Sequence, residues 1–149
     1  MEESESRQSA SGFGVWLVTT PDQDWQEKWN TPPEVAPRLT TASEVRRGGS
    51  LAILILVANP QPDENNRLRL ACDIKVIRPD GSISIEMPNI NCMDAPLVGP
   101  PANIRLADAG INFIAEPEDI SGVWRVQVNV RDINRGITVL VKTAFTLID

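Results

Sequence analysis

Hydrophobic and polar residues alternate along the end of the chain. Every second residue from Trp124 to Val130 is apolar, and after the turn "DINRG" (132–136) a second alternating run extends from Ile137 to Leu147. A period of two is typical of a strand with one face on a core and the other in water. Two such runs joined by a short turn that ends in glycine predict an antiparallel hairpin. Trp124 shares the apolar face of its strand, so we expect its indole in the core.

Similar runs upstream predict further short strands separated by polar turns. They are expected at 13–20, 50–58, 67–77, 82–87, 103–108 and 110–117, with residues 88–101 as a long loop that contains prolines. Turns such as "RPDGS" (78–82) have the composition of tight reversals. Because the strands follow one another without alternating helices, the pattern favours an antiparallel sandwich over a parallel α/β sheet.

One short helix is expected near the N-terminus, in "PDQDWQEKW" (21–29). Trp25 and Trp29 stand four residues apart and therefore share one helix face. The prolines of "NTPPEVAP" (30–37) end the helix after two turns at most. The two indoles have two interpretations. They are either buried against the sandwich as a strap, or exposed as a partner-binding site, because Trp is enriched in interface hot spots.

The first twelve residues, "MEESESRQSASG", are acidic, polar and almost free of apolar side chains. Such a segment cannot bury enough surface to offset its ordering, so we expect a flexible leader over 1–12 and a single domain over 13–149. The segment has no apolar stretch and is therefore no signal peptide. Both an exported protein without its signal and a cytosolic protein with a frayed end would look like this.

The composition disfavours several classes of function. The chain has no His and no Tyr, so the usual general base and the triads built on His are missing. We expect no enzyme, no cofactor and no metal site; a small hydrolase using carboxylates alone is the enzymatic alternative, since Asp and Glu total 20. A net charge of −6 disfavours nucleic acid as a partner. The longest apolar run, "LAILILVA" (51–58), is a strand in length and falls short of the roughly 18 residues of a membrane helix.

The sequence does not decide whether the two cysteines form a disulfide. Cys72 lies on the apolar face of its strand and Cys92 in the loop that follows the next strand. They either form a disulfide or remain two free thiols, one of them buried as a small hydrophobic side chain. If residues 77 and 82 pair across their turn, Cys72 faces residue 87, and the loop must fold back to bring Cys92 close. Arg46 and Arg47, before Gly48, are either an anion site or a solvated connector.

Several stretches resemble a known kind of domain. "VIRPDGSI" (76–83) and the long stretch from Gly110 to Leu147, with its G-x-W-x-V-x-V-x-V-x-D pattern, are similar to immunoglobulin-like sandwich domains of bacterial envelope proteins. "DWQEKWNTPPEV" (24–35) and "VRRGGS" (45–50) resemble the front half of a family of small uncharacterised exported bacterial proteins built on such a domain. The resemblance covers roughly residues 13–148 and implies an all-β immunoglobulin-like sandwich of seven to nine strands.

The resemblance also implies a function and a location. We expect a non-enzymatic binding or accessory module of the bacterial envelope, periplasmic or secreted, with a protein partner. A cytoplasmic protein is the alternative location. The alternative function is an inhibitor or immunity-type protein that blocks one protein partner.

The alternating runs generate a first prediction, which concerns helix content. Far-ultraviolet circular dichroism should show less than roughly a quarter helix, because ordinary domains average about a third. A larger helical signal would contradict the all-β interpretation.

Overall fold

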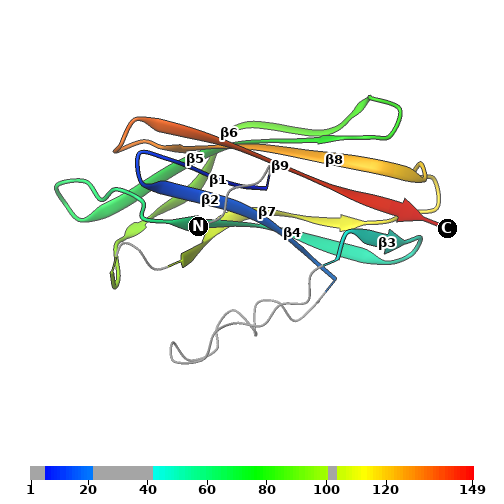
Figure 1. Cartoon of the computed structure of the whole chain (residues 1–149), viewed down its shortest axis with the longest axis horizontal. Helices are drawn as coiled ribbons and strands as arrows, with labels where there is room; N and C mark the ends of the chain where they lie inside the picture. The colour runs from blue at the N-terminus through cyan, green and yellow to red at the C-terminus, as the bar shows by residue number, and fades with distance from the viewer. Residues whose placement is uncertain (1–5, 22–41, 101–103) are drawn as a thin grey trace.

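Two packed β-sheets make up the part of the chain that the structure describes. The computed structural model describes residues 6–21, 42–100 and 104–149. The first sheet has four strands in the order β1 (Arg7–Ala10), β2 (Phe13–Thr20), β4 (Ser50–Ala58) and β7 (Ile104–Ile114). The second has five in the order β3 (Glu44–Arg46), β9 (Ile137–Ile148), β8 (Gly122–Asp132), β5 (Arg67–Ile77) and β6 (Ile83–Pro96). Figure 1 shows the two sheets as separate layers.

The strand pairing confirms an all-β sandwich. All neighbouring strands pair antiparallel except the short β3, which runs parallel to β9. The closing hairpin is β8 and β9, in continuous register from Gly122 opposite Leu147 to Asp132 opposite Ile137. Within the described ranges there is no helix. The expected helix with Trp25 and Trp29 falls almost entirely in 22–41 and so lies outside the described residues.

Residues 7–10 correct the expectation of a flexible leader over 1–12. They form β1, which pairs antiparallel with β2 from Arg7 opposite Trp16 to Ala10 opposite Phe13. The guanidinium carbon of Arg7 lies 4.5 Å from the centroid of the Trp16 ring. An edge strand is held mainly by backbone hydrogen bonds to its neighbour and needs few apolar side chains. The polar composition of residues 7–10 therefore gave no sign of a strand.

The region after the "RPDGS" turn also differs from expectation. Residues 88–96, expected in a loop, continue β6, and the two short strands expected from 103 onward are one strand, β7. β6 is the edge of its sheet, where a proline such as Pro88 removes no ladder hydrogen bond that the sheet needs. Next to it, Asn89 takes a φ of 51°, at a shift in the pairing with β5.

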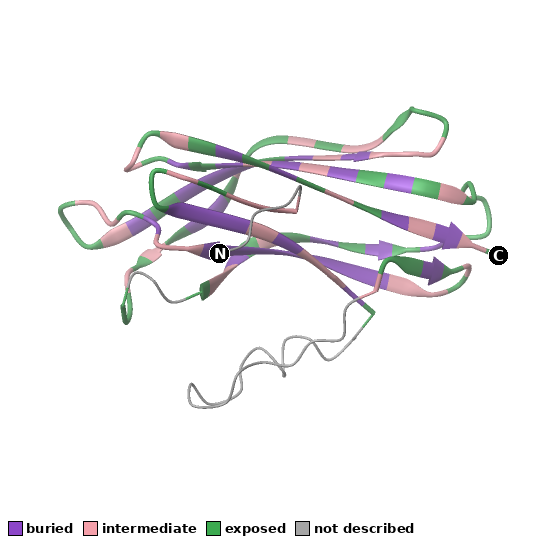
Figure 2. Cartoon of the chain, viewed as in Figure 1, coloured by how far each residue is buried: buried purple, intermediate pink, exposed green. Residues whose placement is uncertain are grey.

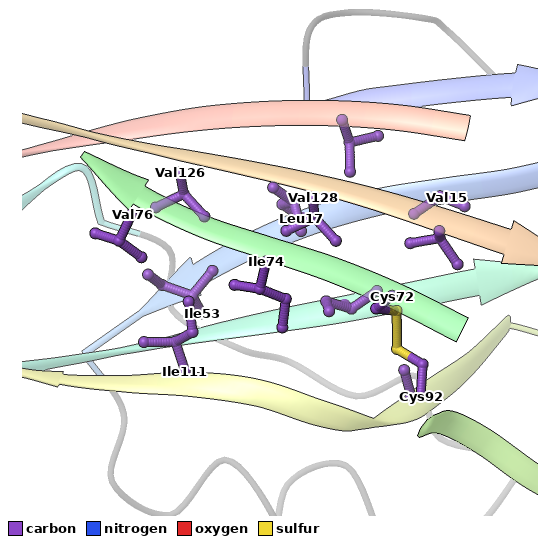
Figure 3. Packing of buried hydrophobic residues seen from close by; sticks show 14 of the residues in the cluster. Val15, Leu17, Ile53, Cys72, Ile74, Val76, Cys92, Ile111, Val126 and Val128 are labelled. Atoms are coloured by element: carbon purple, nitrogen blue, oxygen red, sulfur yellow. A yellow bond between two sulfur atoms is a disulfide. The ribbon is translucent and has the colours of Figure 1, made fainter. Parts of the chain in front are cut away.

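The core lies between the sheets and is made by the inward-facing residues of both. Trp124, on β8, is 1% exposed, which confirms its expected place. Its ring centroid lies 5.0 Å from that of Phe113 on β7 and 6.2 Å from that of Phe145 on β9. Its indole nitrogen donates a hydrogen bond of 2.9 Å to the carbonyl oxygen of Ile120. Figure 3 shows other members of the core, with Ile53 and Ile111 of one sheet facing side chains of the other.

β4 is buried on both of its faces (Figure 2). Its inward side chains belong to the core, whereas Ala52, Leu54 and Leu56 point outward and are still only 6%, 3% and 4% exposed. On that outer face, Leu56 is paired with Trp16 of β2 and with Leu106 of β7. Burial on both faces explains why "LAILILVA" is a continuous apolar run instead of an alternating one.

The pairing of β1 generates a prediction about truncation. A chain beginning at residue 12 should melt about 5 °C below a chain beginning at Ser6, because the β1 ladder and the contact of Arg7 with Trp16 are lost. Thermal unfolding of the two truncated forms measures the difference, and an Arg7→Gln variant reports the share of the cation–π contact. Equal melting temperatures would show that β1 contributes nothing to stability.

Candidate functional site

Cys72 and Cys92 are joined in a disulfide between β5 and β6. Their Cα atoms are 5.6 Å apart, and the two residues are 1% and 0% exposed. Figure 3 shows the bond at the edge of the core. Shifts in the β5–β6 pairing bring the residues together: Cys72 faces Ile90, not residue 87 as a regular hairpin would have it. The bond closes a loop of 20 residues, which stabilises the fold by about 3 kcal/mol on the chain-entropy account.

A buried carboxylate at the β8–β9 turn ties three turns together. Asp132 is 0% exposed and accepts hydrogen bonds from the backbone amide of Gln61 at 2.8 Å and from Nε of Arg135 at 3.3 Å. The same Arg135 guanidinium donates to the carbonyl oxygens of Ser11 and Asn59, each at 2.8 Å. Asp132 and Arg135 therefore hold the β1–β2, β4–β5 and β8–β9 turns at one end of the sandwich.

The pattern of "DINRG" predicted only a turn and did not reveal the buried role of Asp132. The signal was present, because Asp132 continues the inward-facing series of alternate residues that begins at Trp124. A carboxylate on an inward position must be paired or hydrogen-bonded to remain buried.

Arg47 plays a comparable part at the opposite end. Its guanidinium donates hydrogen bonds of 2.8 to 2.9 Å to the carbonyl oxygens of Glu116, Pro117 and Asp119, and one of 2.7 Å to the carboxylate of Asp149. The hydrogen bonds from Arg47 hold the pKa of Asp149 below its ordinary value. Arg47 is thus engaged within the fold and is not an anion site.

The outer face of the five-stranded sheet carries a different arrangement. Gln127 of β8 is paired with Lys75 of β5 on one side and with Lys142 of β9 on the other, and Arg125 lies two residues along β8. Side chains of paired residues point to the same face of a sheet, so the three cations surround Gln127. Neither Arg125 nor Lys142 forms an ion pair or a side-chain hydrogen bond within the described ranges.

A groove of about 670 Å³ runs over these strands. The outward-facing side chains that line it are those of Val123, Arg125, Gln127, Lys142 and Ala144, and Ser6 lies at its border. Val123 is 45% exposed at one end of this surface. At the other end Leu140, which is paired with Asn129 in the row next to Gln127 and Lys142, is 43% exposed. Free cations next to exposed apolar side chains form a surface that can contact a ligand through both charge and apolar area. We call this surface the β8–β9 face.

The described residues offer neither a grouped set of metal ligands nor a helix that could span a membrane. Across residues 6–21, 42–100 and 104–149, no three His, Cys, Asp or Glu side chains are grouped so that they could hold a metal ion. The described residues also include no helix with the length and apolar character needed to cross a membrane. Trp25 and Trp29, the sequence-based candidates for partner binding, lie outside the described residues, and their role stays a prediction.

Comparison with known proteins does not place the chain in a family. No family model and no curated protein matches the chain. Among solved structures, the chain is similar to an alkylpurine DNA glycosylase of Pseudomonas fluorescens bound to DNA containing an abasic site analog, at 13% identity and a TM-score of 0.49. That match covers 93% of this chain and 31% of the glycosylase.

Two further solved structures are similar at lower identity. A family 123 glycoside hydrolase from Clostridium perfringens is 10% identical with a TM-score of 0.49, over 91% of this chain and 27% of the hydrolase. The CARDB domain of a Pyrococcus furiosus protein, in complex with di-metal ions, is 7% identical with a TM-score of 0.47, over 99% of both chains. The chain thus spans less than a third of the length of the two enzymes. Its sandwich architecture rests on its own strand pairing.

The contrast between the two ends of the sandwich generates a prediction. Asp132→Ala should lower the free energy of unfolding by about 3 kcal/mol, because the Gln61 amide and the Arg135 guanidinium lose the buried carboxylate that both bind. Asp149→Ala is the matched control: it also removes a carboxylate bound by an arginine, but its side chain is 79% exposed and the expected loss is below about 1 kcal/mol. Urea denaturation measures both, and equal losses would contradict the role assigned to Asp132.

Proposed function

We propose that the chain is a non-enzymatic binding or accessory module of the bacterial envelope, an immunoglobulin-like sandwich that contacts a protein partner through the β8–β9 face. The observation that carries the proposal is the combination on this face of unpaired Arg125 and Lys142 with exposed Val123 and Leu140. Buried polar side chains elsewhere, such as Asp132, have their partners inside the fold.

The face is well suited to binding because its backbone is fixed. β8 lies between β9 and β5, with a continuous ladder of hydrogen-bonded pairs on each side. The opposite side of the same strand is anchored by Trp124 and the valines of the core. A partner therefore meets side chains on a rigid sheet, and binding orders few additional groups.

The disulfide supports a location in the envelope. Disulfides persist in oxidising compartments such as the periplasm and the exterior of the cell, and are rare in the cytosol. Cys72 and Cys92 are bonded here, and the sequence resembles exported bacterial proteins with immunoglobulin-like domains. Together these two points favour a periplasmic or secreted protein over a cytoplasmic one.

The proposal is tested by comparing capture of one identified partner by three forms of the protein. The wild type, a Val123→Ser, Leu140→Ser variant and an Ile114→Ser control, immobilised under oxidising conditions, are exposed to an envelope extract of the native host. Ile114 is 54% exposed but lies on β7, in the other sheet. We expect one partner, identified by mass, to be held by the wild type and the control and lost by the double variant. Equal capture by all three forms, or no capture, would overturn the proposal.

The two tryptophans provide a separate prediction. If Trp25 and Trp29 form a strap, the outward apolar side chains of β4 and their neighbours give them a surface to pack on. A Trp25→Ala, Trp29→Ala variant would then lose several kcal/mol, because truncating one buried Trp costs about 3–5 kcal/mol. If the indoles contact a partner, the variant should stay stable and lose capture. Denaturation and capture of the same variant decide between these outcomes, and a variant normal in both respects would exclude both interpretations.

A further inference from the structure

We propose that the groove on the β8–β9 face binds an extended acidic segment of the partner polypeptide, with its carboxylates on Arg125 and Lys142 and its apolar side chains on Val123. This inference rests on the proposed function and specifies the chemistry of the partner.

The charge of the groove is opposite to the net charge of the chain. The chain as a whole is acidic, with a net charge of −6, yet the outward-facing side chains around Gln127 are Lys75, Arg125 and Lys142. Most other arginines near the turns and edges are engaged, as Arg47 and Arg135 show. Cations left without partners on an otherwise acidic protein are complementary to a carboxylate-bearing ligand.

The outward-facing residues of the groove lie in regularly spaced rows across the strands. On this face, Ile77, Arg125 and Ala144 form one cross-strand row, and Lys75, Gln127 and Lys142 form the next. Successive rows are two residues apart along a strand, about 6.6 Å. Alternate side chains of an extended polypeptide have the same spacing, so a segment lying along β8 and β9 can place one side chain over each row.

The acidic residues nearby select a polypeptide segment over broader anionic surfaces. Glu86 of β6 is paired with Lys75, and the exposed Asp73 of β5 is paired with Asn129 in the row next to Gln127. A membrane surface or a nucleic acid that covered the whole sheet would meet these carboxylates as well as the cations. A narrow segment confined to the groove over β8 and β9 does not meet them.

Fluorescence polarisation with labelled peptides tests the inference on the full, oxidised chain. The probe is an eight-residue peptide, Val-Ser-Glu-Ser-Glu-Ser-Val-Ser, about 26 Å long when extended, in which the Val and Glu side chains at alternate positions share one face. Its matched controls carry Gln or Lys in place of Glu. We expect the Glu peptide to bind about tenfold more tightly than the Gln peptide at low salt, since each exposed ion pair contributes a few-fold. The difference should largely disappear at about 0.5 M NaCl.

Two variants locate the effect. Arg125→Gln combined with Lys142→Gln should remove most of the preference for Glu, and because both side chains are exposed, the melting temperature should not change. Arg131→Gln is the control: it lies on the same face of β8, about 20 Å from Arg125 along the strand, and its guanidinium donates to the side-chain oxygen of Asn89. That variant should keep the preference of the wild type.

Four outcomes would overturn the inference. The first is equal binding of the Glu, Gln and Lys peptides, and the second is unchanged preference in the double variant. The third is binding of vesicles of phosphatidylglycerol and phosphatidylcholine without binding of any peptide. The fourth is binding of the Glu peptide only after removal of residues 1–5, which would make the chain's own Glu2, Glu3 and Glu5 the occupant, since Ser6 borders the groove. Any of these leaves the proposed function standing if the Val123→Ser, Leu140→Ser variant still loses its partner.

Discussion

The contact of Phe113 with Trp124 and Phe145 is the interaction on which the rest of the structure depends. Phe113 belongs to the four-stranded sheet and the other two rings to the five-stranded sheet, with Phe113 and Phe145 centroids 4.7 Å apart. Large rings from facing sheets set the separation of the layers and account for much of the apolar area that the core removes from water. Since Trp124 lies on the inward side of β8, this contact also fixes which side chains of β8 face outward.

The two ends of the sandwich are closed by polar groups. Asp132 with Arg135 connects three turns at one end. At the other end Arg47 binds the carboxylate of Asp149 and three carbonyl oxygens, those of Glu116, Pro117 and Asp119. Each arginine donates to backbone oxygens of turns other than its own and so connects segments that are far apart in the sequence. In both places a guanidinium provides several donors in fixed directions, which lysine could not do.

Much of the fold was predictable, because the sequence carries the period of two wherever a strand has one buried face. The closing hairpin and the core position of Trp124 followed from that pattern alone, and the antiparallel sandwich followed from the order of the strands. β1 could not be predicted in this way, because a polar edge strand forms through backbone pairing with its neighbour and shows no apolar pattern of its own. The continuation of β6 through Pro88 could not be predicted either. A strand tolerates proline at such a position only at the edge of a sheet, and the sequence does not show which strands are edges.

The candidate site was harder to predict for a different reason. Arg125, Lys142 and Lys75 are far apart in the sequence, and they become neighbours only through the registers of β8 with β9 and with β5. Likewise, Cys72 faces Ile90 because the pairing of β5 with β6 is irregular, and the spacing of residues in the sequence does not predict such shifts. The burial of Asp132 could have been predicted from the sequence, since Asp132 continues the series of inward-facing residues of its strand. Long-range register is therefore the information that a single sequence lacked.

The irregular edge strand β6 has a consequence for how the protein behaves among copies of itself. A straight edge offers a row of free backbone groups on which another chain can add a strand, and this is a common start of aggregation. β6 interrupts that row with Pro88 and with the left-handed Asn89, and the disulfide at Cys92 holds the bent strand to its neighbour. The sheet is thereby protected from edge-to-edge growth, which would otherwise draw copies of the chain into polymers.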